Sequence, residues 1–143
     1  NSHQNCLSMT QAIIVEDELA SQELLTNLVH EYCPGLEIIG VAGNVADAVQ
    51  MIQSSDIDLL FLDIHIGQQT GFDVLDQIKD RDFKVIFTTA HEEYALKAFK
   101  YEAVDYLLKP YTPRELIASV NRIREKIEVG ASDQTKLAAK RCR

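Results

Sequence analysis

The sequence lacks long apolar runs, and this absence limits where the protein can act. Its longest apolar stretches are only a few residues, far short of the roughly 20 that a helix needs to cross a bilayer. Its opening residues, NSHQNCLSMTQ, have neither the basic start nor the apolar centre of a secretory signal. We therefore expect a cytoplasmic protein with no membrane contact.

Cysteine and positive charge are also scarce. The three cysteines, Cys6, Cys33 and Cys142, are odd in number and widely spaced, which suits neither a disulfide framework nor a zinc site. We expect reduced thiols with no ligand role. The formal net charge is −8 although the last residues are basic, and so acidic a body repels phosphates, which argues against direct DNA binding by this chain.

The composition that remains fits one globular domain. The chain has 143 residues, 46% hydrophobic and 25% charged, which is enough to bury a core. Residues 1–8 are expected to be an expression remnant, with Met9 as the natural start. Residues 129–143 are poor in apolar side chains and are expected to be a linker or an added tail. The domain itself is therefore expected to span residues 9–128.

Five short apolar runs alternate with five amphipathic segments along this domain. The runs are rich in β-branched and aromatic residues, as strands are, and they cover residues 12–15, 37–41, 58–62, 84–89 and 103–108. Three of them are almost wholly apolar, which is typical of parallel strands covered on both faces. The pattern predicts an α/β fold with a doubly wound, five-stranded parallel sheet.

Capping residues and spaced apolar residues predict the helices. Asn44 can cap the second helix, and Thr112 and Glu115 form a capping box with Pro113 at the first position of the last helix. The apolar residues expected to face the core are Leu24, Leu25, Leu28 and Tyr32 in the first helix, Phe72, Leu75 and Ile78 in the third, and Leu116, Val120, Ile123 and Ile127 in the last.

Polar side chains occur where four of the runs end. Glu16 and Asp17 follow the first run, Asp63 the third, Thr89 ends the fourth, and Lys109 follows the fifth. Function in such sheets collects beyond the carboxyl ends of the strands, so these side chains are expected to meet in one pocket. Carboxylates without clustered cysteine or histidine suit Mg²⁺ or Mn²⁺ rather than zinc. A metal, a lysine and a hydroxyl around a carboxylate are parts of phosphoryl transfer, with Asp63 as nucleophile.

Four motifs, VEDE, LLFLDI, VIFTTAH and DYLLKPYT, occur in this order and together resemble the receiver domain of two-component response regulators. The likeness runs from about Met9 to about Ile127, and residues 87–110 are similar to receivers attached to LytTR-type (LytR/AlgR-like) DNA-binding output domains. The resemblance implies a flavodoxin-like (βα)5 fold. It also implies a phosphoprotein that phosphorylates itself from a sensor histidine kinase and slowly dephosphorylates, rather than an enzyme. DNA would be reached only through an output domain absent from this chain.

The resemblance implies a role for each residue of the pocket. Asp63 matches the phospho-accepting aspartate, and Glu16 and Asp17 match the acidic pair that binds Mg²⁺ with it. The main-chain carbonyl of His65 is implied as a further metal ligand. Lys109 matches the lysine that contacts the phosphoryl group.

The resemblance also implies a switch, and the chain departs from the family pattern in two ways. Thr89 matches the switch hydroxyl and Tyr106 the aromatic residue that moves with it, while Lys109 precedes Pro110 through what is often a cis peptide in this family. Gly67 stands where many receivers have proline, and the loop HIGQQTG is more polar than usual. These departures leave the conformation of the loop open, but not the chemistry.

The implied switch predicts a homodimer of the phosphorylated chain. Movement of Thr89 and Tyr106 would alter the face made by the fourth helix, the fifth strand and the fifth helix. The charged residues expected to form pairs between subunits there are Lys97, Lys100, Glu102, Asp105, Arg122 and Arg124.

Each of these residues also has a structural interpretation. Glu16 and Asp17 could be helix N-terminal charges, Asp63 and Lys109 a structural ion pair, and Thr89 and Tyr106 ordinary strand residues. Their joint convergence favours the functional interpretation. The histidines His30, His65 and His91 are interpreted as surface residues, with an effect of the last two on phosphoryl lifetime kept as a hypothesis.

Other classes of function fit less well. A haloacid-dehalogenase-like phosphatase normally needs a second acid two residues after its aspartate, where this chain has His65. A flavodoxin-like or dinucleotide-binding protein needs glycines and amides in its first loop, which here reads EDELAS. A pseudo-receiver would lack an acid, the threonine or the lysine, and none is missing.

Overall fold

The computed structural model describes residues 9–133, so Cys6 and Cys142 lie outside the described residues. Each strand of the main sheet overlaps a predicted run. In chain order the elements are β1 (Thr10–Val15), α2 (Leu19–Tyr32), β2 (Leu36–Ala42), α3 (Val45–Gln53), β3 (Leu59–Leu62), β4 (His65–Ile66), β5 (Gln69–Thr70), α4 (Gly71–Asp76), β6 (Lys84–Thr89), the 3₁₀ turn η1 (Glu92–Tyr94), α5 (Ala95–Lys100), β7 (Asp105–Leu108) and α6 (Pro113–Asp133).

The main sheet has five parallel strands in the order β2-β1-β3-β6-β7. The chain winds from β1 outward to β2 on one side and then to β3, β6 and β7 on the other. The winding therefore reverses between β1 and β3, which is where doubly wound sheets bind their ligands. The predicted doubly wound, flavodoxin-like α/β fold is confirmed.

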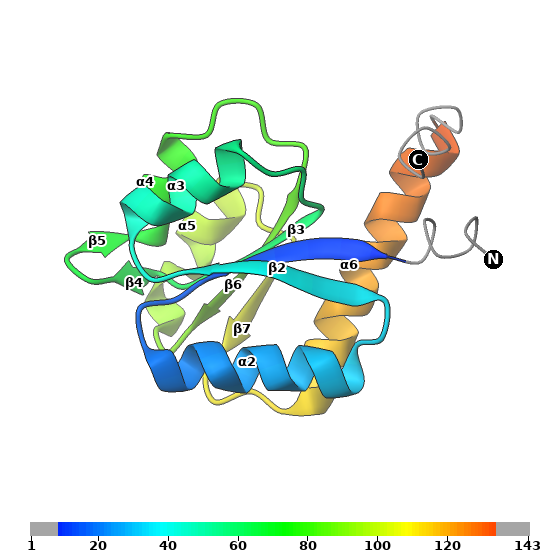
Figure 1. Cartoon of the computed structure of the whole chain (residues 1–143), viewed down its shortest axis with the longest axis horizontal. Coiled ribbons are helices and arrows are strands. Elements are labelled where there is room, and N and C mark those ends of the chain that lie inside the picture. The colour runs from blue at the N-terminus through cyan, green and yellow to red at the C-terminus, as the bar shows by residue number, and fades with distance from the viewer. Residues whose placement is uncertain (1–8, 134–143) are drawn as a thin grey trace.

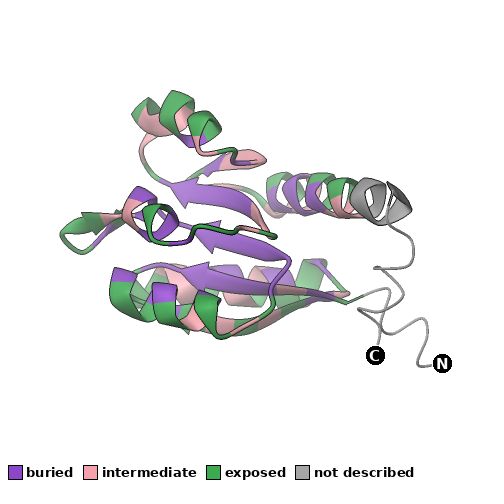
Figure 2. Cartoon of the chain, turned by 90° about the horizontal axis from the view of Figure 1, so that it is seen from above, coloured by how far each residue is buried: buried purple, intermediate pink, exposed green. Residues whose placement is uncertain are grey.

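Helices cover both faces of the sheet (Figure 1). Alternate residues of β1 point to opposite faces: Ile13 and Val15 pack with α3 and α4, whereas Ala12 and Ile14 pack with α2 and α6. The three inner strands β1, β3 and β6 are buried along most of their length, whereas the edge strands β2 and β7 are only partly buried (Figure 2). Burial on both sides explains why the inner strands read as continuous apolar runs.

The predicted face of the first helix was partly wrong. Leu25 and Val29 are buried, and Leu28 is partly buried, but Leu24 is 55% and Tyr32 42% exposed. Leu24, Leu28 and Tyr32 form one apolar stripe and Leu25, Leu28 and Val29 a second, and packing against the sheet selects the second. The periodic pattern alone did not distinguish the two stripes.

The predicted caps are present. The Asn44 side chain accepts a hydrogen bond from the Asp47 backbone N–H at 2.8 Å. The Glu115 backbone N–H donates to Thr112 Oγ1 at 3.1 Å, and the Thr112 N–H donates to the Glu115 carboxylate at 2.8 Å. These bonds satisfy amide groups that the first turn of a helix leaves unpaired.

A small hairpin, β4 and β5, projects beyond the carboxyl ends of the strands (Figure 1). No sequence pattern predicted this hairpin, since strands of two residues have no detectable period. Gly71 closes the hairpin, because its N–H donates to Ile64 O at 2.8 Å. An added Cβ at Gly71 would lie 2.3 Å from the Asp63 carbonyl oxygen, so only glycine fits there.

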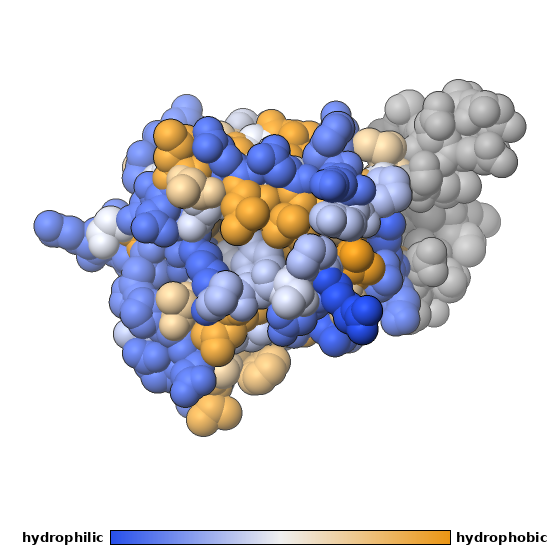
Figure 3. All heavy atoms as spheres, turned by 90° about the horizontal axis from the view of Figure 1, so that it is seen from below, coloured by the Kyte–Doolittle hydropathy of each residue, from blue (hydrophilic) through white to orange (hydrophobic). Residues whose placement is uncertain are grey.

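On the face seen from below, polar residues lie between the groups of apolar side chains (Figure 3). Among residues 9–133, no helix combines the length and apolar character needed to cross a bilayer.

Candidate functional site

The candidate site lies where the sheet changes its winding direction. The parallel register pairs Val15 with Leu62, the last residues of β1 and β3. The backbone pairing continues one residue further, because the Asp63 N–H donates to Val15 O at 3.0 Å. The ladder thus brings the residues that follow β1 and β3 to the same edge, as the strand order requires.

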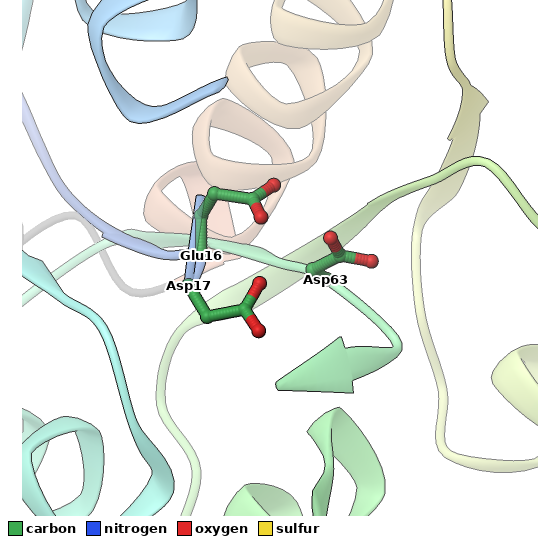
Figure 4. A group of neighbouring side chains, drawn as sticks. All are labelled: Glu16, Asp17 and Asp63. Carbon is green, nitrogen blue, oxygen red and sulfur yellow. The ribbon is translucent and has the colours of Figure 1, made fainter. Parts of the chain in front are cut away.

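Three carboxylates from these strand ends form an acid cluster, defined here as Glu16, Asp17 and Asp63 (Figure 4). One oxygen from each lies within 4.8 Å of the others. Glu16 is only 3% exposed and Asp63 7%, whereas Asp17 is exposed. The predicted convergence of these residues is therefore present in the fold.

Lys109 reaches the acid cluster from the end of β7. Its ammonium Nζ contacts Glu16 Oε1 and lies 3.0 Å from Asp63 Oδ2. The Lys109 N–H also donates to Thr89 O at 2.7 Å, and the Lys109–Pro110 peptide is cis, as the resemblance implied. One cation thus bridges two of the acids, leaving the cluster with more negative than positive groups.

The buried charges shift each other's protonation. Burial, reinforced by the charge of Asp63, raises the pKa of Glu16 from 4.5 to about 7 although Lys109 opposes the rise. Burial by itself would lower the pKa of Lys109, but its hydrogen bonds to Glu16 and Asp63 outweigh burial and raise that pKa. A raised pKa of one acid beside a second carboxylate indicates a site that a further cation would stabilise.

Each carboxylate of the acid cluster also accepts a main-chain N–H. Ile64 N donates to Asp63 Oδ1 at 2.6 Å, and Glu18 N donates to Glu16 Oε2 at 3.2 Å. Gly67 N, at the tip of the hairpin, donates to Asp17 Oδ2 at 2.8 Å. Sequence reasoning missed this last contact, because it joins residues fifty positions apart through an unpredicted hairpin.

The acid cluster fits a hard divalent cation. Its converging oxygens are all carboxylate oxygens, the ligand type that Mg²⁺ and Mn²⁺ prefer. Among the side chains that the structure describes, those of residues 9–127, no other group of three or more histidine, cysteine, aspartate or glutamate ligands was found. The predicted contribution of the His65 carbonyl stays a prediction.

The two predicted switch residues hold the same peptide. Thr89, fully buried at the end of β6, accepts a hydrogen bond from the His91 N–H at 3.2 Å through Oγ1. The Tyr106 hydroxyl donates to the His91 carbonyl oxygen. His91 is therefore held from both sides, and a movement of either side chain changes a bond that the backbone of His91 makes.

The interpretation of the histidines as surface residues was correct for His30 and incomplete for His65 and His91. His30 is exposed on α2. His65 is also exposed, but its ring centroid lies 4.3 Å from that of His91 and 5.4 Å from that of Tyr94 in edge-on contacts. These rings join the loop after β3 to the loop after β6, so His65 and His91 are more than isolated surface residues.

Most of the charged residues expected to pair between subunits already have partners within the chain. Asp105 pairs with Arg122 and accepts a hydrogen bond from Ser119 Oγ at 2.7 Å. The others with partners are Glu102, 3.9 Å from Arg81, Arg124, which donates to Pro34 O at 2.8 Å, and Lys97, 4.6 Å from the centre of the Phe72 ring. Leu96, Phe99 and Leu108, which are 79%, 56% and 40% exposed, lie on the same elements.

Known proteins are similar in sequence to this chain over most of its length. Residues 12–121 match the response regulator receiver domain family. The chain is 36% identical over 120 residues to the sensory transduction protein LytR of Staphylococcus saprophyticus, and 33% identical over 126 residues to LytT of Enterococcus faecalis. These matches cover 80% and 86% of this chain but 46% and 51% of those proteins, so the chain spans about half the length of the curated relatives it matches.

Solved structures share the fold. The response regulatory domain of mrkE from Klebsiella pneumoniae has a TM-score of 0.75 at 32% identity, over 82% of this chain and 98% of that one. TrrA from Thermotoga maritima, a response regulator solved in complex with Mg²⁺ and BeF, has a TM-score of 0.71 at 31% identity, over 80% of this chain and 99% of that one. The family match, the strand order and the signalling relatives agree: the chain belongs to the response regulator receiver domains of two-component systems.

Proposed function

We propose that the chain is a phosphoryl-accepting switch in which Asp63 takes a phosphoryl group from the phosphohistidine of a sensor histidine kinase. The observation that carries the proposal is the buried acid cluster with Lys109 Nζ 3.0 Å from the Asp63 carboxylate. Three carboxylates with a single lysine among them, at the edge of a parallel sheet, are costly unless they bind a further cation. In this role the domain acts in the cytoplasm as a signalling protein and turns over no external substrate.

In the proposed reaction an oxygen of Asp63 attacks the phosphorus atom of the phosphohistidine. The P–N bond breaks, its electron pair returns to the imidazole of the kinase, and an aspartyl phosphate forms. Lys109 is held at the Asp63 carboxylate by two carboxylates, and its raised pKa keeps it charged at neutral pH. Its ammonium group therefore offsets negative charge on the incoming phosphoryl oxygens.

Glu16, Asp17 and Asp63, with the carbonyl of His65, are the residues that would hold Mg²⁺ or Mn²⁺. When bound, the metal supplies positive charge that neutralises the phosphoryl oxygens. The buried Glu16 must then be ionised, which its pKa of about 7 allows near neutral pH. Slow hydrolysis of the aspartyl phosphate would reset the switch.

The test is intact mass after treatment with acetyl phosphate and Mg²⁺. The native chain should gain one phosphoryl group, and chelation of the metal by EDTA should prevent the gain. Asp63→Asn should abolish it, while Asp58→Asn, at the opposite end of the same strand, should not. Phosphorylation that persists in Asp63→Asn or in EDTA would contradict the proposal.

We further propose that phosphorylation favours a homodimer through the α5-β7-α6 face. A phosphoryl oxygen on Asp63 would attract the Thr89 hydroxyl, which then releases the His91 N–H, and the bond from Tyr106 to His91 would adjust with it. Because the charged residues of this face are largely paired within the chain, the exposed Leu96 and Phe99 are the better candidates for the contact.

Sedimentation with and without beryllofluoride tests this coupling. Beryllofluoride should shift the native chain toward a dimer. The shift should be partial, since a ligand shifts an equilibrium only by its differential affinity for the two states. Thr89→Ala and Leu96→Glu should each reduce the shift. An undiminished shift in Thr89→Ala would contradict the coupling and leave the chemistry at Asp63 untouched.

Because the chain spans about half of the LytR and LytT relatives, we propose a transcriptional, DNA-binding output domain in the whole protein. Binding of this chain and of the whole protein to promoter DNA would test the proposal, since only the whole protein should bind.

A further inference from the structure

We propose that the main-chain N–H of Gly67 is a positioning group for Asp17, and that the β4-β5 hairpin thereby tunes how tightly the acid cluster binds Mg²⁺. The inference rests on the metal site of the proposed function. It concerns a position where, by the family resemblance, many receivers carry proline, which has no N–H to donate.

Asp17 needs such a group more than its neighbours do. Glu16 and Asp63 are buried, and each is fixed both by Lys109 and by a main-chain N–H. Asp17 is exposed, and its carboxylate is held through Oδ2 by the Gly67 N–H at 2.8 Å. An exposed aspartate without a partner samples several rotamers, so this bond fixes the orientation in which Asp17 joins the acid cluster.

The hairpin holds that N–H in place. Its strands pair His65 with Thr70 and Ile66 with Gln69, and Ile66 is buried. Its base is closed by the bond from Gly71 N to Ile64 O at 2.8 Å. The tip is therefore not a free loop, because the base of the hairpin is anchored at Ile64, the residue after Asp63, and the Gly67 N–H at the tip lies 2.8 Å from Asp17 Oδ2.

The backbone conformation of Gly67 makes the donor accessible. Its φ is +63°, in the left-handed region that glycine adopts without strain. An added Cβ would meet no atom within 4 Å, so a side chain here changes the backbone and not the packing. Three substitutions of Gly67 then separate the effect of backbone strain from the effect of losing the N–H. Asn tolerates this conformation, Ala is strained in it, and Pro has neither the conformation nor the N–H.

The first test is a titration with Mg²⁺ measured by isothermal calorimetry. The change in melting temperature on adding Mg²⁺ is a second readout. Gly67→Pro should raise the Kd for Mg²⁺ by about tenfold, the lower end of the effect of removing a group that orients a metal ligand. Gly67→Ala should raise it less, and Gly67→Asn should bind about as tightly as the native chain. A native Kd in Gly67→Pro, or an equal loss in Gly67→Asn, would overturn the proposal.

The second test needs no metal and does not depend on the folding of the proline variant. In metal-free protein labelled with ¹⁵N, Asp17→Asn should move the Gly67 amide resonance upfield, because the charged acceptor is lost. An unmoved resonance would overturn the positioning role alone. Failure of the native chain to bind Mg²⁺ at all would instead overturn the proposed function, and this inference with it.

Discussion

Strand β3 has a buried aspartate at each end, and the two have almost the same exposure but different surroundings. Asp58, before the strand, is 8% exposed, and Asp63, after it, is 7% exposed. Asp58 Oδ2 accepts the Gln11 N–H at 2.9 Å, and the backbone of Asp58 bonds to Gln11 and Lys84 on both neighbouring chain segments. Asp63 instead shares its surroundings with the rest of the acid cluster and with Lys109.

The difference shows that burial of a carboxylate does not by itself indicate a functional site. Asp58 fixes the start of β3 against β1, which is a structural role. At the carboxyl end the parallel strands bring like charges together, and burial raises the pKa of Glu16 to about 7. Accumulated like charge with a shifted pKa, rather than a single buried acid, is what points to chemistry.

The largest expected difference between the two ends of β3 is in how far Mg²⁺ stabilises the fold. At a Mg²⁺ concentration of one hundred times Kd, the free energy of unfolding of the native chain should rise by about 2.7 kcal/mol. Asp17→Asn should lose most of this gain because it removes a ligand of the acid cluster. Asp58→Asn should keep it, and urea denaturation with and without Mg²⁺ measures all three.

Removal of the Asp58 carboxylate, before the start of β3, should affect stability and not phosphorylation. Asp58→Ala leaves the Gln11 N–H without this acceptor and should lower the free energy of unfolding by about 1–3 kcal/mol, equally with and without Mg²⁺. Phosphorylation by acetyl phosphate should continue. Loss of phosphorylation in a folded Asp58→Ala chain would show that the two ends are not independent.

A smaller effect should appear in the pH dependence of the metal-free chain. The folded protein holds the Glu16 proton more tightly than the unfolded one, with a pKa of about 7 against 4.5. The contribution of Glu16 to stability is therefore complete below pH 4.5 and is lost as the pH rises through about 7. Urea denaturation should show this fall in the native chain and a flatter profile in Glu16→Gln; identical profiles would contradict the assigned pKa.

The smallest expected effect concerns the histidine rings beside the pocket. His65→Ala and His91→Ala should each change the rate of dephosphorylation a few-fold, because their rings contact each other beside the acid cluster and, by the family resemblance, these positions would flank the path of the hydrolysing water. Phosphorylation rates should change less. Mass spectrometry over time separates the two rates, and equal changes in both would favour a surface role.

The sequence predicted the sheet and the acid cluster because both depend on short-range patterns and a general rule. Buried parallel strands read as apolar runs, and the polar residues that follow them must meet at the carboxyl edge. Glu16, Asp17, Asp63 and Lys109 therefore lie together as predicted.

What the sequence did not predict depends on tertiary contacts. Leu24 and Leu25 are equally apolar, and only packing on the sheet decides which is buried. The β4-β5 hairpin has too few residues to show a period, so the bond from Gly67 to Asp17 could not be foreseen. Likewise, the bonds that Thr89 and Tyr106 make to His91 follow from the path of one loop rather than from any motif.

The most direct measurement would locate the phosphoryl group on the native chain without a mutation. Borohydride reduces an aspartyl phosphate to homoserine, which peptide mass spectrometry identifies by position. After treatment with acetyl phosphate and Mg²⁺, we expect homoserine at position 63 and unchanged aspartate at position 58. Homoserine at another position, or a phosphoryl group carried by His65 or His91 instead, would contradict the central claim that the acid cluster makes Asp63 the acceptor.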